Sequence, residues 1–299
     1  MRLLRSNYRH CWFSIKGIED MAEAIVRDIE YTGRNGTVTI VGLFDIHYGA
    51  RACAEDALAE TVERIRTTPD CLWFGGGDMG EFIIPGDKRY QAQGVARIHK
   101  PEVQAEPTTS MIDGIVKALW PIRTQCLGIM RGNHERTIAR TGGVAPARRI
   151  AEWLGTVYLG EQAWIALNFK RANSTSTQRF VLWAQHGVST RTKNAETAMA
   201  ALARTREHFD YDLGWAGHVH FLDAKVKTPL ELSNERPPKL RQRPVFLAIG
   251  GCFRKDHPIG YDDYADQMTP REPSMLGCAA AIITPDKRRI KAEQWTFWG

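Results

Sequence analysis

Short apolar runs of strand length alternate along the chain with amphipathic segments of helical length. Thr37–Phe44 is an apolar, β-branched run that stops at Asp45, and this pattern is typical of a buried strand. Ala50–Arg66 then carries apolar residues at helical spacing, and Cys71–Phe74 is the next apolar run. A strand, a helix and a second strand in this order predict a sheet with helices on its faces.

The same alternation continues to about residue 155, and a denser pattern of strands follows it. The first stretch predicts helices over Thr108–Trp120 and Ala145–Leu154, with a strand over Gln125–Met130 between them. The closely spaced apolar runs after it predict a second, hairpin-rich sheet. The elements expected there are strands over Thr156–Leu159, Ala163–Phe169, Arg179–Gln185, Leu213–Ala216, Pro244–Ile249, Ala279–Thr284 and Ile290–Phe297, and a helix over Asn194–Phe209.

No internal repeat is visible and no linker separates the two parts, so we expect one domain over residues 1–299, built of two packed sheets with outer helices. Residues 1–36 are a polar stretch with some helical periodicity and no clearly predicted element. Long loops are expected at residues 85–107 and 252–274, and loops of this length in a compact domain are usually functional or mobile. Their cationic candidates for substrate contact are Lys88, Arg89, Arg97 and Arg254.

The composition is that of a folded globular protein. Hydrophobic residues make up 43% and charged residues 25%, which excludes a disordered, collagenous or coiled-coil chain. The formal net charge of +6 favours an anionic partner. Neither an apolar run of about eighteen residues nor a signal-peptide pattern is present, so we expect a cytoplasmic protein with no membrane partner. The 6 cysteines are scattered singly, which favours reduced thiols.

Five of the expected strands end in a cluster of polar or metal-ligating residues. Because open α/β sheets place their sites at the carboxyl ends of strands, we expect these distant segments to converge. Glycines beside the clusters allow the backbone to turn sharply and to approach a small object such as a metal ion. The clusters are Asp45-Ile46-His47, Gly77-Asp78, Gly132-Asn133-His134-Glu135, His186-Gly187 and Gly217-His218-Val219-His220.

The candidate ligand atoms in these clusters are two carboxylates, an amide oxygen and several imidazoles, without sulfur. Such donors suit Mn²⁺, Fe²⁺, Fe³⁺ or Zn²⁺ rather than Cu⁺ or an iron–sulfur cluster. Seven ligands exceed one tetrahedral site, which favours two divalent metal ions, with manganese as the first choice and iron or zinc as alternatives. The two carboxylates cancel half of the metal charge, so the remainder favours a hydroxide and a phosphate-bearing substrate.

In chain order the clusters form the motifs DxH, GD, GNH followed by Glu, H, and GHxH, a set that resembles the calcineurin-like metallophosphoesterase superfamily. The resemblance implies an α/β fold, a four-layer αββα sandwich of two mixed β-sheets flanked by helices. It also implies that a hydroxide bridging the metals is the nucleophile and that His134 assists the leaving oxygen. The implied ligands are Asp45, His47 and His220 for one ion, Asn133, His186 and His218 for the other, and Asp78 as the bridge.

Glu81 stands three residues after Asp78, where protein phosphatases of this superfamily carry an acid that pairs with the catalytic histidine. The resemblance therefore implies that Glu81 orients His134 and raises its pKa. Those phosphatases place a phosphate-binding arginine directly after the acid and lack the GHxH motif. This chain has Phe82 at that position and does contain GHxH, which disfavours a Ser/Thr protein phosphatase.

Three functions compete on this evidence. The first is a metal-dependent phosphodiesterase with nuclease-like activity on DNA or RNA, because GHxH accompanies a basic chain with two long loops that carry basic or aromatic residues. The alternative is a phosphoesterase of small molecules such as nucleotides, cyclic nucleotides or phosphorylated metabolites. A non-catalytic scaffold is disfavoured because every ligand position and the catalytic histidine position are filled. The sequence leaves the oligomeric state and exo or endo action open.

Overall fold

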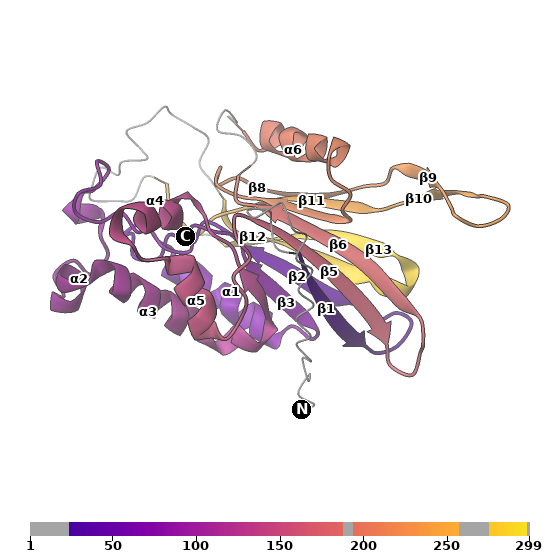
Figure 1. The fold of residues 1–299 in the computed structure, drawn as a ribbon, viewed down its shortest axis with the longest axis horizontal. Coiled ribbons are helices and arrows are strands. Elements are labelled where there is room, and N and C mark those ends of the chain that lie inside the picture. The colour runs from indigo at the N-terminus through magenta and orange to yellow at the C-terminus, as the bar shows by residue number, and fades with distance from the viewer. Residues whose placement is uncertain (1–23, 188–193, 257–274, 298–299) are drawn as a thin grey trace.

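The computed structural model describes residues 24–187, 194–256 and 275–297. They form two mixed β-sheets that pack face to face, with helices on the outer face of each sheet (Figure 1). The layers therefore follow one another as helix, sheet, sheet and helix. The α/β fold class and the four-layer arrangement expected from the sequence are confirmed.

One sheet has five strands in the order β13-β12-β2-β3-β4. Its centre is parallel, because β2 (Val38–Leu43) pairs with β3 (Cys71–Gly75), and β3 pairs with β4 (Cys126–Ile129). β12 (Leu276–Thr284) runs antiparallel to β2, and β13 (Arg289–Phe297) forms the edge. Every residue of β2 is buried, since both faces of this sheet are covered, and this explains why its sequence does not alternate.

The other sheet has six strands, which are β1 (Ala24–Tyr31), β5 (Gln162–Arg171), β6 (Thr177–Gln185), β7 (Leu213–Ala216), β11 (Val245–Gly250) and β8 (Leu222–Lys227) in spatial order. β5 and β6 form the expected antiparallel hairpin, and β6, β7 and β11 are parallel neighbours. β9 (Leu230–Leu232) and β10 (Leu240–Gln242) form a separate hairpin that projects from the body (Figure 1).

Helices cover the five-stranded sheet on its outer face. α1 (Glu55–Thr67), α3 (Pro107–Leu119) and α5 (Pro146–Leu154) pack apolar residues onto Trp73 and Ala280 in one core cluster. The short helix α2 (Pro101–Ala105) precedes α3. This apolar layer on the sheet is the physical reason for the helical spacing in the sequence.

A second core fills the space between the sheets, and a third lies outside the six-stranded sheet. Phe44, Phe74 and Trp215 belong to the middle core. The ring centroids of Phe44 and Phe74 lie 5.7 Å apart, and those of Phe74 and Trp215 lie 5.4 Å apart. α6 (Ala195–Arg204) covers the outer face of the six-stranded sheet around Trp183. Phe44 directly precedes Asp45, so the middle core fixes the end of β2 at which the first polar cluster begins.

One sequence-based expectation for secondary structure is wrong, and two other stretches form elements that the sequence analysis did not assign. Residues 24–31, within the stretch of some helical periodicity, form strand β1, because pairing with β5 from Ala24↔Trp164 to Tyr31↔Arg171 overrides the local pattern. Thr156–Leu159 is not a strand and contributes only the single bridge between Ile129 and Tyr158. The third polar cluster is not only a strand end, since helix α4 (Asn133–Gly142) begins inside it.

Other elements were missed rather than misassigned. The expected loop at residues 85–107 contains α2 and a short 3₁₀ turn at Ala92–Gly94, and β8, β9 and β10 had no predicted counterpart. Residues 1–23 and 257–274 lie outside the described residues, so most of the second expected loop cannot be compared.

The five polar clusters follow β2, β3, β4, β6 and β7, and these strands run parallel within their sheets. Their carboxyl ends therefore meet at the same end of the sandwich, as expected. None of the helices in the described ranges combines the length and the apolar character needed to cross a bilayer. The described cysteines are free thiols, namely Cys53, Cys71, Cys126, Cys252 and Cys278.

Candidate metal centre

The predicted ligands lie on backbone segments that turn abruptly after their strands. Asp45, His47 and Asp78 have φ angles of 50°, 51° and 49°, and His218 and His220 have 70° and 60°. Residues other than glycine rarely adopt this left-handed conformation, which costs on the order of 1–2 kcal/mol each. Such strain gathers at functional sites, where the surrounding structure must hold side chains in place.

Two glycines allow these turns to approach one another. A Cβ atom on Gly132 would lie 2.1 Å from Asp78 Oδ1, and one on Gly77 would lie 2.6 Å from His186 Nδ1. Both distances are shorter than any van der Waals contact. The glycines of the GD and GNH motifs are therefore required for close packing of the site.

Asp45, His47 and His220 form the first ligand group. The Nε2 atoms of His47 and His220 lie 3.1 Å apart, and Asp45 Oδ1 lies 3.6 Å from His220 Nε2. Asp45 is fully buried, and its Oδ2 accepts a hydrogen bond of 2.8 Å from the backbone N–H of His218. Its Oδ1 has no hydrogen-bond partner among the described residues. An orphaned carboxylate oxygen facing two imidazole nitrogens fits a divalent cation.

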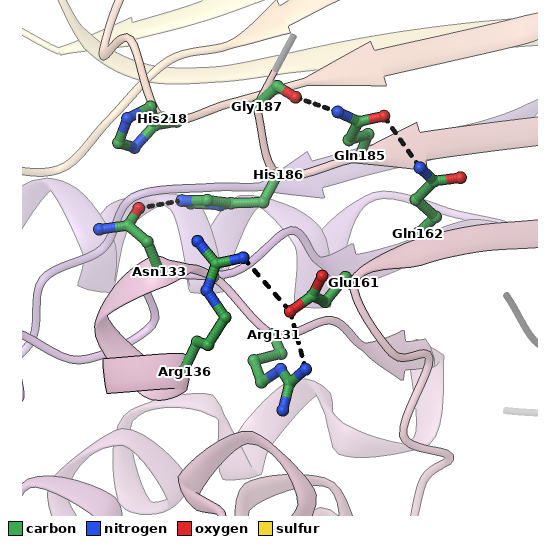
Figure 2. Close-up of a pocket in the computed structure, with 10 residues that line it drawn as sticks. Arg131, Asn133, Arg136, Glu161, Gln162, Gln185, His186, Gly187 and His218 are labelled. Carbon is green, nitrogen blue, oxygen red and sulfur yellow. Dashed lines mark hydrogen bonds and ion pairs between the residues drawn. The ribbon is translucent and has the colours of Figure 1, made fainter. Parts of the chain in front are cut away.

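Asp78, His186 and His218 form the second ligand group, and Asn133 joins it. His186 Nε2 lies 3.1 Å from Asn133 Oδ1 (Figure 2). The same atom lies 3.1 Å from Asp78 Oδ2. His186 Nδ1 lies 2.9 Å from the carbonyl oxygen of Gly76, and donating its proton there leaves Nε2 to face the other donors.

The two groups are adjacent. Asp45 Oδ1 of the first group lies 3.9 Å from His186 Nε2 of the second. All seven predicted ligands therefore gather in one place, as expected from the convergence of the strand ends. Asp78 lies with the second group, and its role as the bridging ligand stays a prediction.

Glu81 departs from its expected contact. Its carboxylate Oε2 binds His47 Nδ1 at 2.7 Å, whereas His134 Nδ1 contacts the backbone carbonyl of Glu81. The backbone turns directly after Glu81, because Phe82 has a φ of 45°, and the carbonyl and the carboxylate reach different histidines. The expectation that the Glu81 carboxylate orients His134 is therefore corrected: it orients His47, the arrangement by which carboxylates fix ligating histidines.

Burial and close charges shift the pKa values in the site. Burial raises the pKa of Asp45 to about 7. Burial would lower the pKa of His186, but Asp78 and Asp45 outweigh it and raise that pKa to about 10. Burial opposes ionisation of Asp78 as well, yet His186 and His134 hold its pKa well below the usual range. Without a metal, the proton on His186 therefore neutralises part of the carboxylate charge.

Glu135 is a structural residue of the site that the sequence reading named only as part of its motif. It is fully buried, and its carboxylate accepts backbone N–H groups of Asp78 at 3.0 Å, Met79 at 2.7 Å and Gly132 at 2.9 Å. These bonds tie the GD turn to the GNH turn. The signal for this role was available, because an acid follows GNH in the motif.

The four candidate substrate contacts lie in different surroundings. Arg89 Nη2 and Nε bind Asp87 at 2.8 Å and 3.1 Å, and its Nη1 lies 3.4 Å from His134 Nε2, so Arg89 lies at the site. Arg97 is paired with Glu55 at 2.6 Å. Lys88 is exposed, and Arg254 is buried.

A cavity of about 340 Å³ opens beside the second ligand group (Figure 2). Asn133, His186 and His218 line one side of it. The sequence analysis did not single out the other lining residues, because none of them is a motif residue, although Arg131, Arg136 and Gln185 directly flank the clusters. These residues include Arg131, Arg136, Glu161, Gln162 and Gln185.

Replacing Glu135 tests its structural role. Glu135→Gln places an NH₂ group against backbone donors, so it should lower the free energy of unfolding by about 2 kcal/mol, the scale of hydrogen bonds to a charged group. Urea denaturation in the presence of a chelator measures the loss. Glu152→Gln, an exposed site on α5, is the matched control and should change stability by less than about 0.5 kcal/mol. Equal stabilities of the two variants would contradict the role.

Metal binding should weaken as the pH falls. The raised pKa of His186, about 10, means that a bound metal displaces its proton throughout the neutral range, and Asp45, with a pKa of about 7, adds a second proton below neutrality. Affinity for Mn²⁺ should fall about tenfold per pH unit near pH 8 and more steeply near pH 6. Calorimetry in two buffers of different ionisation enthalpy counts the protons released. Binding without proton release would contradict the assignment.

Comparison with known proteins gives structural similarity only. No family model and no curated protein matches the chain. Among solved structures, zinc-bound Vps29 from Entamoeba histolytica is 13% identical over 87% of this chain and 99% of its own, with a TM-score of 0.39. A metallophosphoesterase from Sphaerobacter thermophilus is 13% identical over 86% of this chain and 87% of its own, with a TM-score of 0.36. NAD nucleotidase from Haemophilus influenzae is 9% identical over 87% of this chain and 50% of its own, with a TM-score of 0.41.

The motif order and the structure agree with each other. The ordered motifs implied two sheets between helices and a metal site at the strand ends, and the structure has both features. The chain therefore has the four-layer fold that the resemblance to the calcineurin-like metallophosphoesterases implied, with candidate metal-binding groups of histidine and aspartate.

Proposed function

We propose that the protein is a phosphodiesterase that depends on two divalent metal ions, with manganese as the first choice. The observation that carries the proposal is the pair of adjacent ligand groups around the orphaned Asp45 Oδ1. The first ion would be held by Asp45, His47 and His220, and the second by Asn133, His186 and His218, with Asp78 between them. When bound, such ions lower the pKa of water toward neutrality and neutralise phosphoryl oxygens.

Neighbouring groups orient these ligands before any metal arrives. The Glu81 carboxylate holds the His47 ring by Nδ1, and the Gly76 carbonyl holds the His186 ring in the same way. Each contact leaves Nε2 facing the other donors of its group. This prior orientation supports metal affinity, because less ordering is needed when the metal binds.

We infer that His134 assists the leaving group. Its ring is buried and packs edge-on against His47, with centroids 4.9 Å apart. Burial lowers its pKa, but Asp78 and Glu81 outweigh this effect and raise the pKa above the usual value. With Nδ1 held by the Glu81 carbonyl, Nε2 is the atom from which His134 gives its proton to the leaving oxygen.

Arg89 is a candidate for binding the reacting phosphate. Its guanidinium is held by Asp87 and lies 3.4 Å from His134 Nε2, on the side of the proposed proton transfer. Phe82 occupies the position where related protein phosphatases carry their phosphate-binding arginine. Arg89, from a different segment, supplies the positive charge that Phe82 lacks.

Nucleic acid is our first substrate class, since the chain has a net charge of +6 and Arg89 lies at the site. The cavity of about 340 Å³ favours a second candidate, a small-molecule phosphoester whose substituent it would enclose. The affinity of a site that contacts many phosphates falls steeply as the salt concentration rises, whereas the affinity of a pocket for one phosphate changes little. A salt series on DNA and on bis-p-nitrophenyl phosphate therefore separates the two candidates.

A substrate panel tests the function itself. Bis-p-nitrophenyl phosphate, p-nitrophenyl phosphate, cyclic nucleotides and DNA would be assayed with Mn²⁺, Fe²⁺, Zn²⁺ and Mg²⁺ in turn. We expect hydrolysis of the diesters with Mn²⁺, loss of activity in EDTA, and about two metal ions per chain by elemental analysis. Metal-loaded protein that hydrolyses no substrate of the panel would overturn the proposal and favour a scaffold.

His134→Ala tests the proton donor. Because general acid catalysis contributes about 10²–10⁴-fold, kcat on a diester with a poor leaving group should fall by that factor while bound metal stays unchanged. His99→Ala is the control, since His99 is exposed and lies outside the site. The effect should shrink for p-nitrophenolate, a leaving group that needs little protonation. An unchanged kcat on both esters would contradict the role.

A further inference from the structure

The cavity beside the second ligand group has a charged far wall. Its near wall is formed by the ligands Asn133, His186 and His218. Its far wall contains two arginines and one glutamate, Arg131, Arg136 and Glu161 (Figure 2). A substrate whose reacting phosphate lies at the ligand groups therefore places the adjoining part of the molecule against this far wall.

The far wall carries more positive than negative charge. Glu161 Oε1 lies 2.7 Å from Arg131 Nη2 and 3.6 Å from Arg136 Nη1, so one carboxylate serves two guanidinium groups. A guanidinium has five N–H donors and a carboxylate accepts about four hydrogen bonds, so donors remain in excess. Arg131 Nε is buried and has no hydrogen-bond partner within the described part of the chain. The net charge of the three groups is about +1.

Arg136 is held at a fixed place relative to the ligands. It lies in the first turn of α4, three residues after Asn133, which joins the second ligand group. In Figure 2 its side chain extends from the helix toward the ring of His186 and toward Glu161. Its side chain is 52% exposed, so its guanidinium can bind an incoming group without first losing a buried contact.

The roof of the cavity adds no charge. Gln162 and Gln185 are paired across β5 and β6, and Gln162 Nε2 donates to Gln185 Oε1 at 3.2 Å. Amides of this kind donate and accept hydrogen bonds without repelling an anion. Among the described residues that line the cavity, Glu161 is the only carboxylate, and the two arginines already neutralise it.

We propose that this cavity binds a second phosphate group of the substrate, next to the phosphoester that is cleaved, through Arg131 and Arg136. Guanidinium groups bind phosphate by paired, charge-assisted hydrogen bonds, and the exposed guanidinium of Arg136 can offer such donors to a group in the cavity. The proposal rests on the proposed function and narrows its substrate class to molecules with at least two phosphate groups. Both an oligonucleotide and a small bisphosphate carry that chemistry.

Kinetics with a matched pair of esters test the second phosphate. Thymidine 5′-(p-nitrophenyl phosphate) would be compared with the same ester carrying a 3′-phosphate. For the wild type we expect the 3′-phosphate to lower KM about tenfold, which corresponds to about 1.4 kcal/mol. Arg136→Ala should remove most of this preference. Arg140→Ala, an exposed arginine one turn further along α4 and outside the cavity lining, should keep it.

A binding experiment without turnover separates this proposal from the proposed function. Metal-free protein would be titrated with thymidine 3′,5′-bisphosphate and with thymidine 5′-monophosphate by calorimetry, and the bisphosphate should bind about tenfold more tightly in the wild type but not in Arg136→Ala. Oligothymidylate and inorganic pyrophosphate, titrated in the same way, distinguish an oligonucleotide from a small bisphosphate as the source of the second phosphate.

Two outcomes overturn the second-phosphate site: equal KM and affinity for the paired ligands in the wild type, or equal losses in Arg136→Ala and Arg140→Ala. Failure of the metal-loaded wild type to hydrolyse any substrate of the panel, including bis-p-nitrophenyl phosphate, which carries no second phosphate, overturns the proposed function instead. The paired thymidine ligands therefore test the second-phosphate site, and the panel with bis-p-nitrophenyl phosphate tests the proposed function.

Discussion

The rest of the structure depends on the burial of two carboxylates, Asp45 and Asp78, among imidazoles at one end of the paired sheets. A buried carboxylate is unstable unless hydrogen-bond donors or positive charges surround it. Backbone N–H groups of His218 and His134 bind one oxygen of each, at 2.8 Å and 2.9 Å, and His186 holds a proton between them. Within the described residues Asp45 Oδ1 lacks such a partner, and a metal cation fits that need.

This constraint explains why backbone strain gathers where the strands end. Five candidate ligands adopt positive φ angles, which is unfavourable for each residue on its own. The surrounding structure offsets the cost: the core around Phe44 fixes the end of β2, and Glu135 binds the GD and GNH turns together. The turns are thus held in the geometry that brings oxygen and nitrogen donors together. In this way, rigidity of the fold supports preorganisation of the site.

The first turn of α4 links the site to the adjoining cavity. Asn133, His134, Glu135 and Arg136 are consecutive, and a helix turns by about 100° per residue, so their side chains point in four directions. Asn133 faces His186, His134 faces Arg89, Glu135 faces the buried backbone, and Arg136 faces the cavity. One helical turn therefore fixes the relative positions of a candidate ligand, the proposed proton donor, a structural anchor and the proposed phosphate-binding arginine.

The sequence by itself determined the layer order, most strands and helices, and the clusters that form the candidate metal site. It did so because buried strands and helices have distinct apolar periods, and because polar residues at strand ends cannot be explained by core packing. Edge strand β1 could not be predicted from the sequence. Its residues alternate between more and less exposed positions only because the strand pairs with β5 at the edge of the sheet.

Tertiary structure alone decided which partners the site residues have. Glu81 lies close in sequence to neither His47 nor His134, and only the folded turn at Phe82 directs its carboxylate to the first and its carbonyl to the second. Glu161 and Arg136 meet for the same reason, although they are far apart along the chain. Residue type and spacing specify which chemistry is available, whereas contacts between distant segments depend on how the sheets pack.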